Sequence, residues 1–549
     1  MAVGLMGILA PAFGYLPALG GTDLSLAPFR HLLAMPGLWQ SAALSFAVGL
    51  ATTLIALLSV LGFVAAFSGT AFFRFARQVL GPMLAVPHAA AAFGFALIVA
   101  PSGLLFRLAA LPFGWSRPPD LLIVGDPLGL AMMAGLIVKE VPFLLLVVFA
   151  ALPQADPVRR LRLARSLGYG RMAGFILGVW PEVYRQIRLP VLAVAAFASS
   201  VVDVALILGP TTPAPLAVRL LKWMGDPDLA MRFMASAGAL LQLGITLAVL
   251  ATWMLLERLG NRVCRLAVHR GARMVEDRVA RGAAGVPITL ATLALCLGLL
   301  GLALWSVAGF WAFPALWPPS LSPRAWMHAL DAAAGPLRTT AVVGLCAAGL
   351  ALVLVVALLE SLRHSASSAA SERRQLPRFI AGLLYLPLIV PQIAFVFGLQ
   401  ITALALGLKP SLALLVVVHL VFVAPYVALA LADPWFSLDP RFERMGASLG
   451  RSKPAVFLHI RLPLLLAPAL TAAAIGFAVS VGQYLPTVLI GAGRLPTITT
   501  EAVASASGGD RRIIGAYGLL QTALPFLAFA LATAAPALLY RHRRGMRPG

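Results

Sequence analysis

Charged residues are scarce in this chain of 549 residues, and acidic residues are the scarcest. Only 11% of the residues are charged and 60% are hydrophobic, with 20 Asp and Glu against 42 Lys and Arg. A soluble domain must cover its surface with polar groups, and this composition offers too few of them. The sequence therefore predicts an integral membrane protein that exposes most of its surface to lipid.

ATP-binding and catalytic motifs are also missing. The phosphate loop of ATPases requires a lysine directly after a glycine, and none of the four lysines in the chain follows one. The Ser, His and Asp residues form no nucleophile motif, and the three cysteines and eight histidines lack the spacing of a metal site or a disulfide framework. We therefore expect no enzyme activity, no cofactor and no metal site.

The cations lie between apolar runs and are not clustered. Nucleic-acid-binding proteins gather Lys and Arg on one solvated surface, so nucleic acid is not an expected partner. In membrane proteins, Lys and Arg stay on the cytoplasmic side during insertion. With the N-terminus in the cytoplasm, 29 of the 42 cations fall on that side, 12 fall on the other, and Lys139 lies within a span. We predict a multi-pass protein of the bacterial cytoplasmic (inner) membrane with both termini cytoplasmic.

Apolar segments of membrane-spanning length recur along the whole chain. A helix needs about 20 apolar residues to cross the hydrocarbon core. The first half contains candidates at residues 4–20, 42–66, 79–100, 128–152, 190–209 and 236–257. The second half contains candidates at residues 286–309, 337–360, 379–404, 412–432, 464–491 and 517–540. The predicted fold is all-α: a polytopic membrane protein with about twelve transmembrane helices.

The two halves of the chain share ordered sequence matches. Five residues recur with identical spacing: Val86, Pro87, Ala90, Phe93 and Gly94 match Val390, Pro391, Ala394, Phe397 and Gly398. Later matches follow in the same order: Pro142 with Pro425, Asp156-Pro157 with Asp439-Pro440, and Ser166-Leu167-Gly168 with Ser448-Leu449-Gly450. Six spans separate corresponding segments, so both copies enter the membrane in the same direction as a parallel repeat.

The matches divide the chain into two six-helix repeats. We predict a first repeat at residues 1–257, a basic cytoplasmic linker at 258–285, a second repeat at 286–540 and a basic tail at 541–549. The linker contains seven arginines and no apolar run.

The longest cytoplasmic loops, residues 153–189 and 433–463, follow the fourth span of each repeat. Gly168 precedes Pro181 by thirteen residues, and Gly450 precedes Pro463 by thirteen. This spacing predicts a short helix, a turn at the glycine, a second short helix and a proline at the re-entry to the membrane. Phe175 and Phe457 lie seven residues past the glycines, on an apolar face whose partner is either the rest of the protein or another chain.

These loops resemble the coupling loops of ABC importer permeases, whose consensus is Glu-Ala-Ala, three residues, Gly, nine residues and Ile-x-Leu-Pro. The second loop matches this pattern at Gly450, Ile460, Leu462 and Pro463. The first loop matches it at Ala164, Gly168 and Pro181, with Gly178 and Trp180 in place of Ile and Leu. Arg162 and Arg444 replace the acidic residue, and Glu443 stands one position away.

The resemblance implies a permease with two kinds of partner besides membrane lipid. Two copies of a separate ABC ATPase would dock, one on each loop, and a periplasmic or lipid-anchored binding protein would deliver the substrate. The docking residues implied are Ala164, Ser166, Gly168, Phe175 and Pro181 in the first loop and Ser448, Gly450, Phe457, Leu462 and Pro463 in the second. Fused permeases of this type occur among iron(III)- and thiamine-type importers, and the stretch Leu208–Pro213 (LGPTTP) is most similar to the thiamine-type branch.

Polar residues within the spans are candidates for the substrate pathway, because they are costly in lipid unless they face a cavity or a partner. The candidates are Asp203, its counterpart Gln483, and Glu140. Interhelical hydrogen bonding is the alternative for the first two, and a pair with Lys139 or snorkelling is the alternative for Glu140. A secondary transporter driven by an ion gradient also has twelve spans in two parallel halves. The paired loops favour the ATP-driven importer over that alternative.

Overall fold

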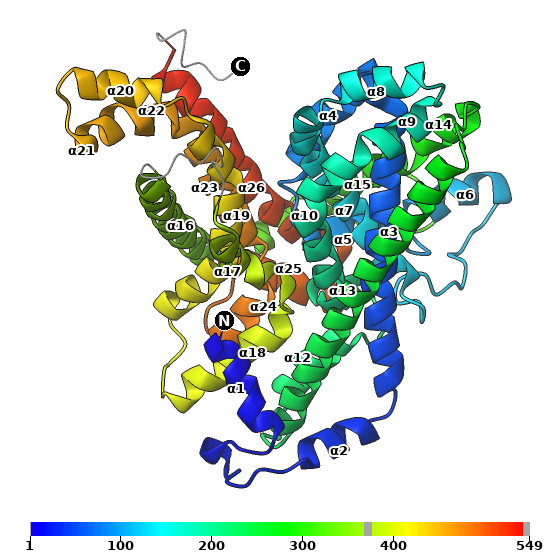
Figure 1. The fold of residues 1–549 in the computed structure, drawn as a ribbon. Helices are drawn as coiled ribbons and strands as arrows, with labels where there is room; N and C mark the ends of the chain where they lie inside the picture. The colour runs from blue at the N-terminus through cyan, green and yellow to red at the C-terminus, as the bar shows by residue number, and fades with distance from the viewer. Residues whose placement is uncertain (1, 367–375, 542–549) are drawn as a thin grey trace. The chain divides into compact units, whose positions relative to one another are not determined.

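The computed structural model describes residues 2–366 and 376–541. Regular secondary structure in these residues is helical, and two isolated β-bridges are the only extended pairings among them. The chain divides into two compact units (Figure 1). Unit 1 contains Met1–Asp331, Ile389–Lys409 and Ala502–Leu519, and unit 2 contains Ala332–Leu388, Pro410–Glu501 and Leu520–Gly549. The all-α prediction is confirmed.

Eight stretches of helix in the described residues are long and apolar enough to cross a membrane, and two broken pairs raise the number to ten. The eight involve α3 (Leu38–Phe67), α5 (His88–Val99) with α6 (Leu104–Phe113), α7 (Leu130–Ala151), α13 (Met231–His269), α15 (Val286–Ser306), α16 (Arg324–Ala366), α19 (Leu412–Ser437) and α26 (Arg511–Leu539). The pairs are α17 (Arg378–Ile389) with α18 (Gln392–Ala405), and the short helices α21 and α22 with α23 (Leu466–Val481). These ten correspond to ten of the twelve predicted spans.

The other two predicted spans are not continuous helices of membrane-spanning length. For 4–20, the structure contains α1 (Ala2–Ala12), whose 11 residues fall short of the 20 or so that a crossing requires. For 190–209, α10 (Trp180–Ser200) ends before Val201, and α11 (Asp203–Leu208) follows it. Neither of these two predicted spans is therefore formed by one continuous crossing helix.

The Val-Pro pair shared by the two halves marks a helix break. In unit 1, α4 (Ala71–Met83) ends before Val86-Pro87, and α5 begins at His88. Proline has no amide proton and disfavours a helical conformation in the residue before it. The freed carbonyls are satisfied from α7, because Lys139 Nζ donates to the carbonyls of Met83 and Leu84, both at 3.1 Å. Val390-Pro391 separates α17 from α18 in the same way.

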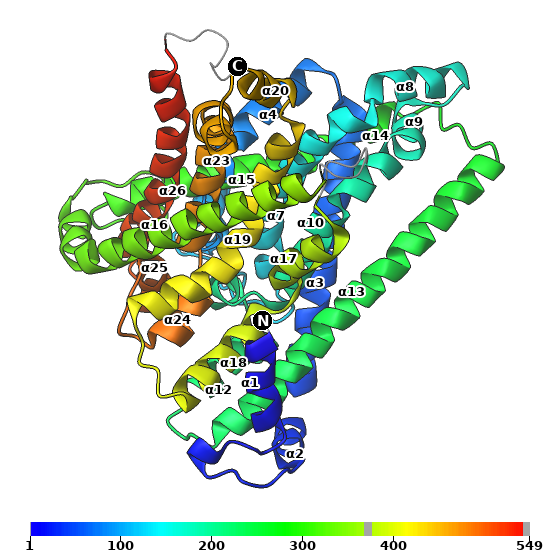
Figure 2. The ribbon, with the colours of Figure 1, turned by 60° about the vertical axis from the view of Figure 1, so that its left-hand side comes forward.

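The glycine of the shared motif is a helix-crossing point within unit 1. A Cβ atom on Gly94 of α5 would lie 2.8 Å from the backbone of Gly298 in α15. A Cβ atom on Gly398 of α18 would overlap the carbonyl of Gly4 in α1. Figures 1 and 2 both show α1 beside α18. The first helix of each predicted repeat therefore packs against the helix after the Val-Pro break of the other repeat.

Several shorter helices complete the fold. They are α2 (Ala27–Ala34), α12 (Leu216–Met224), α14 (Arg278–Ala284), α24 (Leu485–Gly491) and α25 (Ile498–Gly508), together with the helices of the two loops 153–189 and 433–463 described below.

Candidate functional site

Both predicted loops form a hairpin of two short helices joined at a glycine. The first hairpin joins α8 (Pro157–Ser166) to α9 (Arg171–Gly178), and the second joins α20 (Arg441–Ser448) to α21 (Lys453–Val456). Gly168 has a φ of +83° and Gly450 a φ of +74°, a conformation that other residues adopt only with strain. The predicted order of helix, glycine turn and helix is confirmed in both loops.

The two turns share one hydrogen-bond pattern. In the first hairpin the N–H of Gly168 donates to the Arg165 carbonyl at 2.9 Å, and the N–H of Tyr169 donates to the Ala164 carbonyl at 3.0 Å. In the second hairpin Gly450 donates to Ala447 at 3.0 Å, and Arg451 donates to Gly446 at 3.2 Å. This is the Schellman motif, which ends a helix by satisfying its last free carbonyls. The hydroxyls of Ser166 and Ser448 add a bond to the carbonyls three residues earlier, at 2.8 and 2.9 Å.

A small residue at one matched position lets the two helices of each hairpin approach closely. A Cβ atom on Gly174 in α9 would lie 2.8 Å from the Cβ of Ala164. In the second hairpin, 282 residues further along the chain, Gly446 replaces Ala164, and a Cβ atom there would lie 2.6 Å from Ile460 Cδ1. Ala164 therefore has a packing role inside the hairpin, where a larger side chain would push the helices apart.

The two phenylalanines face the protein's own core. Phe175 is 0% exposed and lies in the main hydrophobic cluster of unit 1. The Phe457 ring is partly buried, with its centroid 6.3 Å from that of Trp435 in α19. Of the two partners left open by the sequence, the rest of the protein is the one observed. These side chains anchor the hairpins from the inside.

Both re-entry prolines stand at the start of a helix. Pro181 lies in the first turn of α10. The helix continues through Pro190, nine residues further along the chain. Leu462 and Pro463 belong to α22 (Leu462–Leu464), which follows a π-helical turn at Phe457–Arg461. The first hairpin is therefore continuous with a helix that leads to the break before Asp203.

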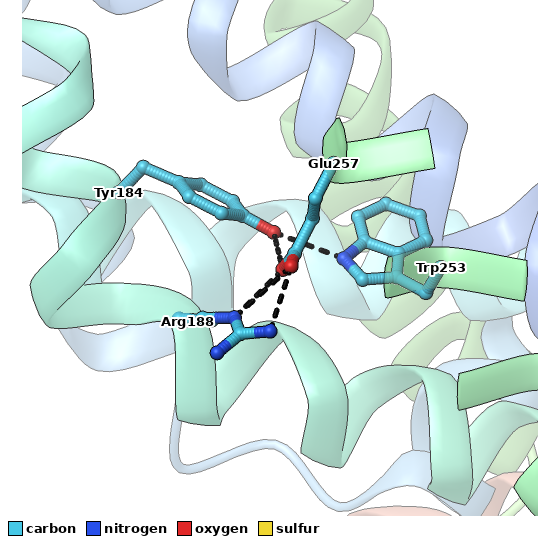
Figure 3. A network of polar contacts seen from close by, with 4 residues as sticks. All are labelled: Tyr184, Arg188, Trp253 and Glu257. Atoms are coloured by element: carbon cyan, nitrogen blue, oxygen red, sulfur yellow. Dashed lines mark hydrogen bonds and ion pairs between the residues drawn. The ribbon is translucent and has the colours of Figure 1, made fainter. Parts of the chain in front are cut away.

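A polar network ties the start of α10 to α13 (Figure 3). The Tyr184 hydroxyl donates to Glu257 Oε1 at 2.6 Å and accepts from Trp253 Nε1 at 2.9 Å. The Arg188 guanidinium donates to both oxygens of Glu257 at 2.8–3.1 Å. Burial, and then the hydrogen bond to Glu257, raise the pKa of the Tyr184 phenol, so the hydroxyl keeps its proton and donates. Sequence analysis missed this network; the spacing of Tyr184 and Arg188, one helical turn apart, was the available signal.

The second hairpin is held by a different network. Arg461, whose side chain is 3% exposed, forms ion pairs with Glu360 and, at 3.1 Å, with Glu443. Arg363 also contacts Glu443 at 2.7 Å. Glu443, the acid one position from the motif site, is therefore engaged inside unit 2. The Tyr540 hydroxyl at the end of α26 donates to the Pro463 carbonyl at 2.9 Å.

The outer faces of both hairpins carry the same pattern of exposed side chains. In α8 and its cap, an apolar pair one turn apart, Leu163 and Leu167, is 62% and 56% exposed. At the matched positions of α20 and its cap, Met445 and Leu449 are 58% and 76% exposed. Arg162 and Arg444 precede the first member of each pair, are exposed, and form no ion pair within the described part of the chain. Sequence analysis missed these pairs, although their offset of 282 residues equals that of the glycines.

Two of the three pathway candidates lie at helix breaks, and the third, Glu140, lies inside α7. Asp203 begins α11 after the break in the fifth predicted span, and Gln483 lies between α23 and α24 in the eleventh. Glu140 pairs with His88 at 3.2 Å, not with Lys139. Asp203 interacts electrostatically with the same imidazole. Unit 1 therefore brings Glu140 and Asp203 together around His88, a residue that sequence analysis did not single out.

The LGPTTP stretch lines an open pocket of unit 1. The pocket has a volume of about 420 Å³, and its wall includes Thr211, Thr212 and Pro213 together with Arg219 and Trp223. The Arg219 guanidinium lies 4.9 Å from the centre of the Trp223 ring. Among the residues with defined positions, no group of three or more His, Cys, Asp or Glu side chains is arranged so that it could hold a metal ion.

Comparison with known proteins gives two relatives. The chain is 32% identical over 546 residues to the inner membrane ABC transporter permease protein YnjC of Escherichia coli K12. The aligned region covers 98% of this chain and 96% of that protein. It is 25% identical over 216 residues to the spermidine/putrescine transport system permease protein PotC homolog of Mycoplasma pneumoniae, covering 39% of this chain and 72% of that protein. No family model matches the sequence. Because the first similarity extends over nearly the full length of both proteins, this chain belongs to the family of ABC transporter permeases, multi-pass transport proteins of the inner membrane that are not enzymes.

Proposed function

We propose that this chain is the membrane-spanning subunit of an ATP-driven importer and that each hairpin docks one copy of a separate ABC ATPase. The observation that carries the proposal is the repeated apolar pair, Leu163 with Leu167 and Met445 with Leu449, on the outer face of each hairpin. Large apolar side chains that are more than half exposed at matched positions are typical of contact sites for a partner. The Schellman turns fix the helix that presents each pair.

The anchoring contacts support a coupling role. Phe175 is buried in the core of unit 1, and the Glu257 network fixes the start of α10 to α13. A hairpin held in this way moves with the helices to which it is attached. ATP binding and hydrolysis in the ATPase would then shift α10, and with it the helix break before Asp203, between inward-facing and outward-facing states.

We also propose the domain organisation and orientation predicted from the sequence. Two parallel repeats, 1–257 and 286–540, joined by linker 258–285, are supported by the paired hairpins, the paired helix breaks and the paired glycine crossings. The match of 216 residues to a permease agrees with a repeat of that size. Both termini are proposed to be cytoplasmic; of the basic tail 541–549, only Arg541 lies within the described residues.

The substrate is proposed to be a small solute of the thiamine or iron(III) type, delivered by a periplasmic or lipid-anchored binding protein. The similarity of the LGPTTP stretch to the thiamine-type branch supports this class. Asp203, Gln483 and Glu140 are proposed to line the pathway. Both relatives are named as permeases of transport systems, and neither name points to the alternative of an ion-gradient-driven transporter.

Co-purification in detergent with a co-expressed candidate ABC ATPase tests the docking. Gly168→Pro and Gly450→Pro remove the left-handed turn of one hairpin each, because proline fixes φ near −65°. Gly114→Pro is the matched control, since Gly114 has a φ of +66° in the predicted outer loop. We expect the two hairpin variants to bind less ATPase and the control to bind as much as wild type. An ATPase that never co-purifies, or that binds all variants equally, contradicts the proposal.

A further inference from the structure

The linker between the predicted repeats is in contact with the first hairpin. Between the end of α13 at His269 and the start of α14 at Arg278, residues 272–277 form a segment that we call the strap. The N–H of Gly170, at the start of α9, donates to the Arg273 carbonyl at 2.9 Å. The N–H of Met172 donates to Asp277 Oδ2, also at 2.9 Å. The first N–H groups of a helix have no acceptor within it, and the strap supplies one for α9.

Asp277 acts as a cap that comes from a distant part of the sequence. The residue is 9% exposed and occupies the N-cap position of α14, yet its side chain makes no capping bond to that helix. Its carboxylate faces α9 instead, where the helix dipole favours a negative charge. Arg281 provides a countercharge 3.6 Å away.

Glycines in the first hairpin leave room for the strap. A Cβ atom on Gly170 would overlap the Met274 carbonyl, and one on Gly168 would lie 3.2 Å from the Arg273 guanidinium. At the matched positions of the second hairpin, Gly450 has open space within 4 Å, and Ser452 replaces Gly170. In the described part of the chain, the strap is therefore a feature of one hairpin only.

The strap extends the exposed surface of the first hairpin. Met274 and Val275 are 64% and 68% exposed, on a segment hydrogen-bonded to Gly170, three residues after Leu167 in the chain. Arginines accompany the apolar side chains in both segments: Arg159, Arg162, Arg165 and Arg273 are exposed and form no ion pair among the described residues. The combined surface is apolar and strongly cationic.

We propose that the strap is part of the ATPase docking surface of the first hairpin. It positions α9 through Asp277, and it adds Met274 and Val275 to the contact with an ATPase subunit whose facing surface combines an apolar pocket with carboxylates. The proposal rests on the proposed function, because it requires an ATPase at the hairpin. It has the consequence that the two ATPase copies meet unequal surfaces, one with the strap and one without it.

Hydrogen exchange measured by mass spectrometry on the full chain in nanodiscs tests the positioning role without the ATPase. In Asp277→Ala, we expect the segment containing the Met172 amide to exchange about tenfold faster, because this amide loses its charge-assisted hydrogen bond to the carboxylate. Ser452→Ala, at the matched position of the strap-free hairpin, is the control and should leave that segment unchanged. Equal exchange in wild type and Asp277→Ala overturns the positioning role.

The same measurement after addition of the candidate ABC ATPase that co-purifies with the chain tests the docking role. Joint protection of residues 158–167 and 272–277 is the expected result. Protection of both hairpins but not of 272–277 overturns the strap proposal and leaves the proposed function standing. Protection of neither hairpin contradicts the proposed function. Protection of 272–277 by phosphatidylglycerol nanodiscs alone, to the level seen with ATPase, identifies lipid headgroups as the occupant and overturns the proposal.

Discussion

Replacing Glu257 should loosen the attachment of the first hairpin to α13 by a predictable amount. The Tyr184 hydroxyl donates to this carboxylate at 2.6 Å, and a hydrogen bond to a charged group contributes about 1.5–3 kcal/mol. The Arg188 side chain is 47% exposed, so its ion pair is screened and contributes at most about 1 kcal/mol. We therefore expect Glu257→Ala to lower the free energy of unfolding by about 3 kcal/mol.

Glu257→Gln removes the negative charge and keeps nearly the same side-chain shape, so it measures the contribution of the charge alone. The amide still accepts from Tyr184, but as a neutral bond worth about 1 kcal/mol, so this variant should lose about 1–2 kcal/mol. Both variants would be measured by reversible unfolding in mixed micelles, and repeated in an Arg188→Met background to isolate the ion pair. A loss below about 0.5 kcal/mol in Glu257→Ala, the range of an unimportant surface substitution, would refute the reasoning.

Three further predictions concern docking, helix crossing and helix breaks. Leu163→Glu should reduce ATPase binding at least tenfold in a pull-down titration. The protein should still fold, because the Leu163 side chain is 62% exposed. Leu122→Glu is the control, since Leu122 is 69% exposed in the predicted outer loop. Gly398→Leu should leave little folded protein in size-exclusion profiles, because its Cβ overlaps backbone, whereas Gly349→Leu, which meets nothing within 4 Å, should fold. Lys139→Met should cost about 1–3 kcal/mol in unfolding measurements, because the Leu84 carbonyl at the helix break loses the lysine donor and the Met83 carbonyl keeps only the 3.3 Å bond from the Val86 N–H.

Local sequence chemistry predicted the features that depend on a few neighbouring residues. The hairpins follow from Gly168 and Gly450, because a glycine in the left-handed conformation ends a helix whatever surrounds it. The spans follow from apolar runs long enough to cross a bilayer. The break at residues 84–87 was missed because a proline inside a membrane helix is tolerated and need not interrupt it. The break at 201–202 was missed because Val201 and Val202 carry no local helix-breaking signal.

Features that depend on distant segments could not be predicted. Gly94 and Gly398 were found as a repeat, but their role depends on Gly298 and Gly4, which the sequence does not connect to them. A pair with the adjacent Lys139 was one alternative for Glu140, and the hydrogen bond observed is with His88, 52 residues away. Phe175 could have faced a partner chain or the core, and only its burial decides between them. Pairings between distant segments are set by packing, which a single sequence does not reveal.

The central claim is that one chain couples to two ATPase subunits through its two hairpins. Native mass spectrometry of the complex purified in detergent measures this most directly. The account predicts one copy of this chain with two copies of the ATPase, and loss of ATPase copies when Gly168→Pro and Gly450→Pro are combined. A chain that carries no ATPase, or that keeps both copies in the double variant, would contradict the account.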